Sequence, residues 1–156
     1  MSQVFVSGHK SPDTDSIAAA LSYSYLKRRL GMDAVAVRAG EINKESRFAL
    51  DYFNLEEPML VTSVARKNPE DEKQKVILVD HNESKQTIDG MDDAEVLEII
   101  DHHRFGDFES ENPIFILVRP VGCVNTVIYG LYKANHIKPS REIAGIMLSA
   151  IISDTV

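Results

Sequence analysis

The stretch Gly8-His9-Lys10-Ser11-Pro12-Asp13-Thr14-Asp15-Ser16 decides how this chain is interpreted. It follows a short apolar run at residues 4–6 and precedes a helix-like run that begins near Ile17. A buried strand that leads through a short loop into a helix is typical of an α/β unit. One imidazole and two carboxylates therefore leave a predicted strand within seven residues, in a loop too short to scatter them.

The rest of the chain alternates predicted strands with predicted helices. Apolar runs predict further strands at residues 33–39, 59–61, 76–80, 96–100 and 114–118. Apolar spacing predicts helices at residues 15–30, 125–135 and 141–152, and one of about ten residues after an N-cap at Asn43. We expect Asp15 or Ser16 to cap the first helix and Gly31 to end it.

The predicted strands are apolar on both faces, as in parallel sheets that are covered on both sides. With no internal repeat, we expect an α/β fold with a mostly parallel β-sheet sandwiched by helices. A length of 156 residues predicts one domain, residues 1–156.

Composition excludes several classes of protein. The net charge of −7, without a basic block, argues against a non-specific nucleic-acid surface. Cys123 is the single cysteine, so no internal disulfide forms, and we interpret it as a small residue at the edge of the core. The start at Met1 is not signal-like and no apolar run has membrane-spanning length, so we expect a cytoplasmic protein.

Polar side chains follow the predicted strands where each strand ends. His9, Asp80, His102 and His103 all hold such positions. In parallel sheets the carboxyl ends of the strands form the ligand crevice. Taken singly, Asp13, Asp15, Asp80 and Asp154 each have another explanation, as turn, loop or capping residues. Taken together with the histidines, they predict a metal site.

The residue types suggest which metal binds and what chemistry follows. Carboxylates mixed with imidazole suit Mn²⁺, Co²⁺, Fe²⁺ or Zn²⁺. We expect two ions that share a bridging ligand, for which Asp80 is the best candidate, and hydrolysis of a phosphoanhydride or phosphoester bond. Four aspartates balance two divalent ions, so a phosphate substrate needs further cations. Only Lys10 and a protonated His103 are evident nearby.

Four stretches together resemble a known family. The opening G-H-K-S-P-D-T-D-S, V-D-H-N-E at residues 79–83, D-H-H at residues 101–103 and S-D-T at residues 153–155 resemble the motifs of the DHH phosphoesterase superfamily. The match is best to the family II, manganese-dependent inorganic pyrophosphatases. The first two motifs favour these enzymes over relatives that cleave oligonucleotides or polyphosphate.

The resemblance implies a role for each residue. His9 and Asp13 would bind one metal ion, and Asp15, His102 and Asp154 the other. Asp80 would bridge the two ions and take part in catalysis. His103 would lie beside the substrate phosphates as a hydrogen-bond or proton donor, and Asp101 would orient the histidines. The cofactor would be two Mn²⁺ ions, with Co²⁺ or Mg²⁺ as substitutes, and the reaction in-line attack on pyrophosphate.

The resemblance also implies partners and a departure. Family members have a C-terminal domain that supplies the substrate-binding Lys and Arg, and we expect this chain to be the N-terminal domain without it. Pyrophosphate would be the substrate, without nucleic acid or membrane, and the N-terminal domain would form a homodimer through sheet edges. Two alternatives stay open: a metal-binding, dimerising module without turnover, and a DHH phosphodiesterase for short oligonucleotides or cyclic dinucleotides.

Overall fold

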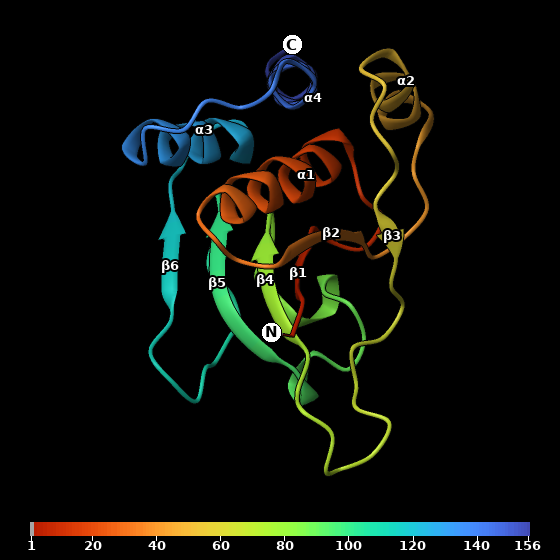
Figure 1. Cartoon of the computed structure of the whole chain (residues 1–156), viewed down its shortest axis with the longest axis vertical. Helices are drawn as coiled ribbons and strands as arrows, with labels where there is room; N and C mark the ends of the chain where they lie inside the picture. Colours follow the sequence, from red (N-terminus) through yellow and green to blue (C-terminus); the bar gives the residue numbers. More distant parts are fainter. Residues whose placement is uncertain (1) are drawn as a thin grey trace.

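Six parallel strands form one sheet in the order β3-β2-β1-β4-β5-β6 (Figure 1). The computed structural model describes residues 2–156, and Met1 lies outside it. The strands are β1 (Val4–Ser7), β2 (Ala34–Arg38), β3 (Met59–Leu60), β4 (Lys75–Val79), β5 (Glu95–Asp101) and β6 (Phe115–Val118). From β1 the chain moves outward to β3, and from β4 it moves outward the other way to β6. The strand order therefore reverses between β1 and β4, where parallel sheets open a crevice.

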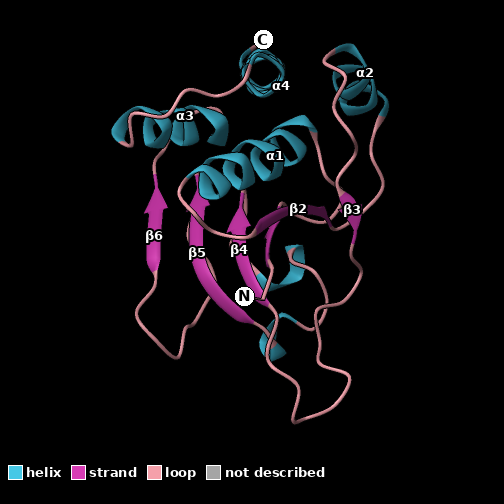
Figure 2. Ribbon diagram, viewed as in Figure 1, coloured by secondary structure: helices cyan, strands magenta, loops and turns pink. Residues whose placement is uncertain are grey.

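The α-helices lie on one side of the sheet (Figure 2). They are α1 (Thr14–Arg29), α2 (Lys44–Tyr52), α3 (Val124–Ala134) and α4 (Arg141–Thr155). α1 packs on the central strands, α3 packs on β5, and α4 lies over both helices. Alternate strand residues such as Val6, Ile77 and Ile100 meet these helices in one buried cluster. The predicted α/β fold with a parallel sheet is confirmed.

The other face of the sheet has a different cover. Two short 3₁₀ helices, η1 (Ser84–Gln86) and η2 (Met91–Asp93), and the loops around them pack against it. Leu78 and Ile99 bury their side chains there against Ile88 and other loop residues. Right-handed crossovers place the connections after β4 and β5 on the face opposite α1. These connections contain no helical apolar stripe, so loops rather than α-helices complete the sandwich on this side.

The first helix begins one residue earlier than predicted, at Thr14 rather than at residue 15. Asp13 is the N-cap of α1, since its Oδ1 accepts a hydrogen bond of 2.9 Å from the Ser16 backbone N–H. The expectation that Asp15 or Ser16 caps this helix is therefore wrong. Apolar spacing indicates where the buried residues of a helix begin, whereas the capping residue belongs to the polar turn that precedes them. Gly31 follows the helix with a φ of 95°, as predicted.

The last helix continues further than expected. α4 extends through Thr155, so Asp154 lies in its final turn and not in a loop beyond Ile152. The Thr155 hydroxyl donates back to the Ile151 carbonyl at 2.6 Å within this turn. The final turn is exposed, so its residues carry no apolar signal. Among residues 2–156, no helix combines the length and apolar character that a membrane crossing requires.

Candidate metal centre

The loop after β1 folds back on the start of α1. The His9 backbone N–H donates to Ser16 Oγ at 2.9 Å. A Cβ on Gly8 would lie 2.0 Å from the same oxygen, so this close approach requires glycine. The fold of the loop brings His9 Nε2 to 3.6 Å from Asp13 Oδ1. Asp13 thus caps the helix and also faces the imidazole.

Asp80 follows β4 and lies at the centre of the site. Asp80 is 1% exposed, and its backbone is left-handed, with a φ of 63°. Asp80 Oδ2 lies 3.3 Å from His9 Nε2, and Oδ1 lies 2.9 Å from His102 Nε2. β4 pairs with β1 on one side and β5 on the other, so the strand ends bring one histidine to each oxygen. The two oxygens of one carboxylate therefore face two different imidazoles.

A second group of ligand atoms lies on the β5 side. His102 Nε2 is 3.5 Å from Asp15 Oδ2. Ligand atoms of Asp15, Asp154 and Cys123 lie within 4.8 Å of one another, as do those of His9, Asp13 and Asp80. The structure therefore brings all six predicted ligands together, in two groups that meet at Asp80.

Both histidines have the orientation that metal-binding imidazoles adopt. His9 Nδ1 lies 2.6 Å from the Lys10 carbonyl, and His102 Nδ1 lies 2.7 Å from the Val121 carbonyl. A carbonyl oxygen only accepts, so each Nδ1 carries a hydrogen and each Nε2 is directed at carboxylates. Metal-ligating histidines are held in this way by backbone carbonyls or carboxylates. The donor set therefore fits divalent cations.

The charges of the site are strongly coupled in the absence of metal. Burial favours a higher pKa for Asp80, but hydrogen bonds and charge from His102 and His9 bring that pKa down to about 2. Burial favours a lower pKa for His9, but Asp13 and Asp80 raise it to about 10. The hydrogen bond to Asp80 raises the pKa of His102 to about 9 against the effect of burial. Two imidazolium charges thus stand where metal charge would neutralise the carboxylates.

The remaining carboxylates repel one another. Burial and the charge of Asp80 raise the pKa of Asp15 to about 7. Burial and the charge of Asp13 raise the pKa of Asp154. Close carboxylates with raised pKa values form a cluster that divalent cations would stabilise.

His103 lies beside the two groups rather than inside them. Its Nδ1 is 2.7 Å from Asp101 Oδ1 and 3.8 Å from Asp80 Oδ1, and its side chain is half exposed. The fully buried Asp101 carboxylate also accepts from the His102 backbone N–H at 2.8 Å. The amide of Asn82 donates to the other Asp101 oxygen at 2.7 Å. Asp101 therefore holds the orientation of His103 from behind.

Two residues of the site carried no signal in our sequence analysis. Cys123 and Asn125 surround the Asp15 carboxylate, although Cys123 was interpreted as a core-edge residue and Asn125 only as the start of a helix. Both follow β6 and open α3. The rule that polar residues after parallel strands converge would have identified them had it been applied to this last strand.

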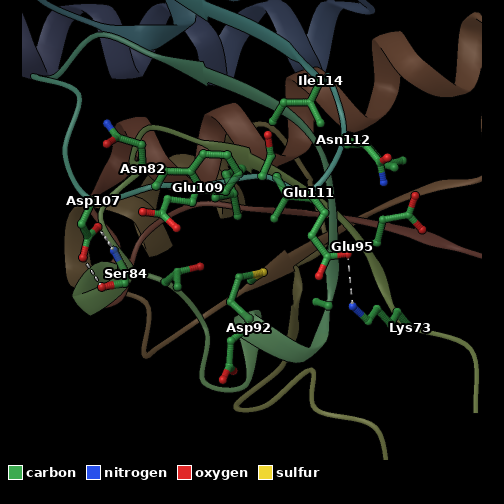
Figure 3. A pocket seen from close by; sticks show the side chains of 18 of the residues that line it. Lys73, Asn82, Ser84, Asp92, Glu95, Asp107, Glu109, Glu111, Asn112 and Ile114 are labelled. Atoms are coloured by element: carbon green, nitrogen blue, oxygen red, sulfur yellow. Dashed lines mark hydrogen bonds and ion pairs between the residues drawn. The ribbon is translucent and has the colours of Figure 1, made fainter. Parts of the chain in front are cut away.

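A separate cavity of about 790 Å³ lies on the loop-covered face of the sheet. Figure 3 shows Ser84, Asp92, Glu95 and Glu109 around it. We call it the loop-face cavity. Among the residues that line it, none is a predicted metal ligand. Its carboxylates at Asp92, Glu95 and Glu109 are exposed to solvent, unlike Asp80 and Asp15.

Comparison with known proteins agrees with the expected resemblance. Residues 3–151 match the DHH family, N-terminal domain. This chain belongs to the DHH family. The four stretches that resembled DHH motifs lie together, in the loops after β1, β4 and β5 and in the last turn of α4.

Curated relatives carry the name "Probable manganese-dependent inorganic pyrophosphatase". That of Bacillus licheniformis is 51% identical over 156 residues, which is 100% of this chain and 49% of the relative. That of Exiguobacterium sp. is 49% identical with the same coverage. The chain therefore spans about half the length of the curated relatives it matches.

Two solved structures share the fold of this chain. A Methanococcus jannaschii protein, described as a "putative family II inorganic pyrophosphatase", superposes with a TM-score of 0.84 and 39% identity, over 97% of this chain and 48% of that one. An exopolyphosphatase-related protein from Bacteroides fragilis gives a TM-score of 0.69 at 20% identity, over 99% of this chain and 46% of that one. The second likeness concerns the fold alone.

Proposed function

We propose that the whole protein hydrolyses inorganic pyrophosphate to two orthophosphates, at a dinuclear manganese centre carried by this chain. The observation that carries the proposal is Asp80, whose two oxygens face His9 and His102 from a buried position. The names of the relatives supply the metal and the substrate.

The ligand assignment follows the two groups of side chains. His9 and Asp13 would hold one Mn²⁺ ion, and Asp15, His102 and Asp154 would hold the other, with Asp80 shared. Co²⁺ or Mg²⁺ would serve as substitutes, since carboxylate and imidazole donors accept these ions too. Bound Mn²⁺ would lower the pKa of a shared water and offset the negative charge of the phosphates.

His103 supplies what the ligands do not. It is half exposed and its Nδ1 is held by Asp101, so its ring can meet a ligand from solvent. We assign it a hydrogen bond to the substrate and a proton for the leaving phosphate. Asp101 Oδ1 lies 2.7 Å from His103 Nδ1 and fixes the direction of the ring.

Cations for the phosphates are scarce among the described residues of the site. Lys10 pairs with Asp89, and Arg104 pairs with Glu83. Pyrophosphate would therefore be held by Lys and Arg from outside this metal-binding domain. This favours a second candidate for the 156 residues alone: a metal-binding module with little or no turnover.

A homodimer through the sheet edges and a cytoplasmic location belong to the same proposal. β6 is an edge strand, and its Phe115 and Ile116 are 47% and 43% exposed. An apolar edge strand can pair with a second copy. Neither nucleic acid nor a membrane is part of the proposed reaction.

Phosphate release tests the proposal. With Mn²⁺, a protein that extends this chain to the full length of its relatives should release phosphate from pyrophosphate rapidly. The 156-residue chain alone should release it slowly. Rapid release by the chain alone would mean that outside cations are dispensable. Faster cleavage of a short oligonucleotide than of pyrophosphate by the full-length protein would favour the phosphodiesterase alternative and contradict our proposal.

A further inference from the structure

The first turn of α3 surrounds the carboxylate of Asp15. Asp15 Oδ1 accepts from Cys123 Sγ at 2.8 Å, from Asn125 Nδ2 at 2.6 Å and from the Asn125 backbone N–H at 3.3 Å. Asp15 Oδ2 accepts from the Val124 backbone N–H at 2.9 Å. Asp15 and Cys123 are 108 residues apart in the chain, yet Asp15 of α1 acts as the anion at the start of α3.

The side chain of Asn125 is itself fixed. It is fully buried, and its Oδ1 accepts from the Ser22 hydroxyl at 2.9 Å. The amide nitrogen must therefore face Asp15, where it also donates to the backbone carbonyl at 3.1 Å. The donor cannot rotate away without leaving buried polar groups unpaired, which is unfavourable.

The two oxygens of Asp15 receive different numbers of hydrogen bonds. Oδ1 receives three hydrogen bonds, which occupy the space around it. Oδ2 receives one and lies 3.5 Å from His102 Nε2. Oδ2, which can still accept a further bond, is therefore the oxygen that faces the other proposed ligands.

We infer that Asn125 and Cys123 are positioning residues, which hold Asp15 by Oδ1 so that Oδ2 alone is presented to a metal ion. This rests on the proposed metal centre and adds to it the residues that set one ligand. Both residues are buried, so they would act on the metal ligand Asp15 and not on the substrate. Their effect should be confined to the ion bound by Asp15 and His102, because His9 and Asp13 make no contact with α3 in the hydrogen bonds of the site.

The same contacts also stabilise α3, so the test must separate two roles. Cys123 is the N-cap residue but makes no capping hydrogen bond with its side chain, and Asp15 caps the helix in its place. A purely structural role predicts lower thermal stability with unchanged metal binding. A positioning role predicts selective loss of one metal-binding step.

The experiment is Mn²⁺ titration of the 156-residue chain by calorimetry, with free Mn²⁺ followed by electron paramagnetic resonance. His102→Ala identifies the step that belongs to the second ion. Asn125→Ala should weaken that step by about 10-fold or more, as expected when a residue that hydrogen-bonds to a metal ligand is removed. The other step should stay unchanged. Cys123→Ala should weaken it less, and Cys123→Ser, which keeps a donor, should restore it.

Asn135→Ala is the matched control, since it removes an asparagine from the C-cap of the same helix. It should change neither step. Thermal melting monitors folding, and if Asn125→Ala does not fold, the Cys123 pair carries the test.

Both Mn²⁺ steps unchanged in folded Asn125→Ala or in Cys123→Ala would overturn the inference. Equal weakening by Cys123→Ala and Cys123→Ser would overturn the role of the thiol as donor. A wild-type chain that binds no Mn²⁺ would instead contradict the proposed metal centre, and the inference with it.

Discussion

The proposed metal centre and the loop-face cavity both gather acidic side chains, but they differ in how those charges are held. In the metal centre, Asp80 and Asp15 are buried, and imidazole nitrogens lie within 3.5 Å of both. Around the loop-face cavity, Asp92, Glu95 and Glu109 are exposed, and no histidine is among its lining residues. Exposed carboxylates keep their hydration, whereas buried ones need a partner charge. Burial and mixed donors, rather than volume or net charge, therefore distinguish the proposed metal centre from the loop-face cavity.

Removing the shared carboxylate should have the largest effect. Asp80→Ala and Asp80→Asn should both weaken Mn²⁺ binding by more than about 100-fold, beyond what loss of a residue behind a ligand costs. Calorimetric titration measures the change. Glu109→Gln in the loop-face cavity is the control and should bind Mn²⁺ like the wild type. Undiminished binding by Asp80→Asn would remove the bridging assignment.

Metal should stabilise the folded chain through the same groups. At a free Mn²⁺ concentration near 1,000 times Kd, the free energy of unfolding should rise by about 4 kcal/mol. Thermal melts with and without chelator measure this, and Glu109→Gln should show the same rise. If Glu109→Gln lost the rise while Asp80→Asn retained it, Mn²⁺ would bind at the loop-face cavity and not at the proposed metal centre.

Metal binding should release protons and tighten as the pH rises. The pKa values of His9 and His102, about 10 and about 9, mean that both carry a proton at pH 7 without metal. Ligation requires neutral imidazole and ionised carboxylate, so binding at pH 7 should release about two protons from the histidines and part of a proton from Asp15, whose pKa is about 7, and should strengthen toward pH 9. Titration in two buffers with different ionisation heats counts the protons. Binding that is independent of pH would contradict the two histidine assignments.

The same pKa shifts predict the opposite trend for the metal-free chain. Both histidines have a folded-state pKa above the usual 6.5, so their stabilisation is fully present below pH 6.5. It is lost as the pH rises through 9 to 10. The metal-free melting temperature should therefore fall over this window, and a rise would mean that these imidazoles are neutral in the fold.

The smallest effect should come from the loop-face cavity. Thr87 lines it, is 6% exposed, and its hydroxyl has no hydrogen-bond partner among the described residues. Thr87→Val should leave Mn²⁺ binding unchanged and raise stability by up to about 1 kcal/mol, since it removes a buried unpaired hydroxyl. Urea unfolding measures this against Thr62→Val, an exposed control. A clear loss of stability would show that the hydroxyl has a bound partner.

The sequence was sufficient to predict the strands and the ends where they place His9, Asp80 and His102, because parallel strands converge at one edge. The same rule extends to Cys123 and Asn125 after β6, but it does not give their contact with Asp15, since a hydrogen bond between distant helices leaves no local pattern. The assignment of the first cap to Asp15 or Ser16 and the end of the last helix at residue 152 were wrong for a different reason: apolar periodicity gives no signal in exposed turns.

The left-handed backbone at Asp80 limits what evolution can place there. Asparagine, aspartate and glycine adopt a φ near 63° at low cost, whereas other side chains lose about 1–2 kcal/mol. Glycine offers no ligand, and asparagine offers no charge. The left-handed backbone favours glycine, asparagine or aspartate, and metal binding requires a charged oxygen ligand. Of these three residues, aspartate alone meets both requirements. In a library of all twenty amino acids at this position, selection for folding should enrich glycine, asparagine and aspartate, and selection for metal binding should enrich aspartate above the other two.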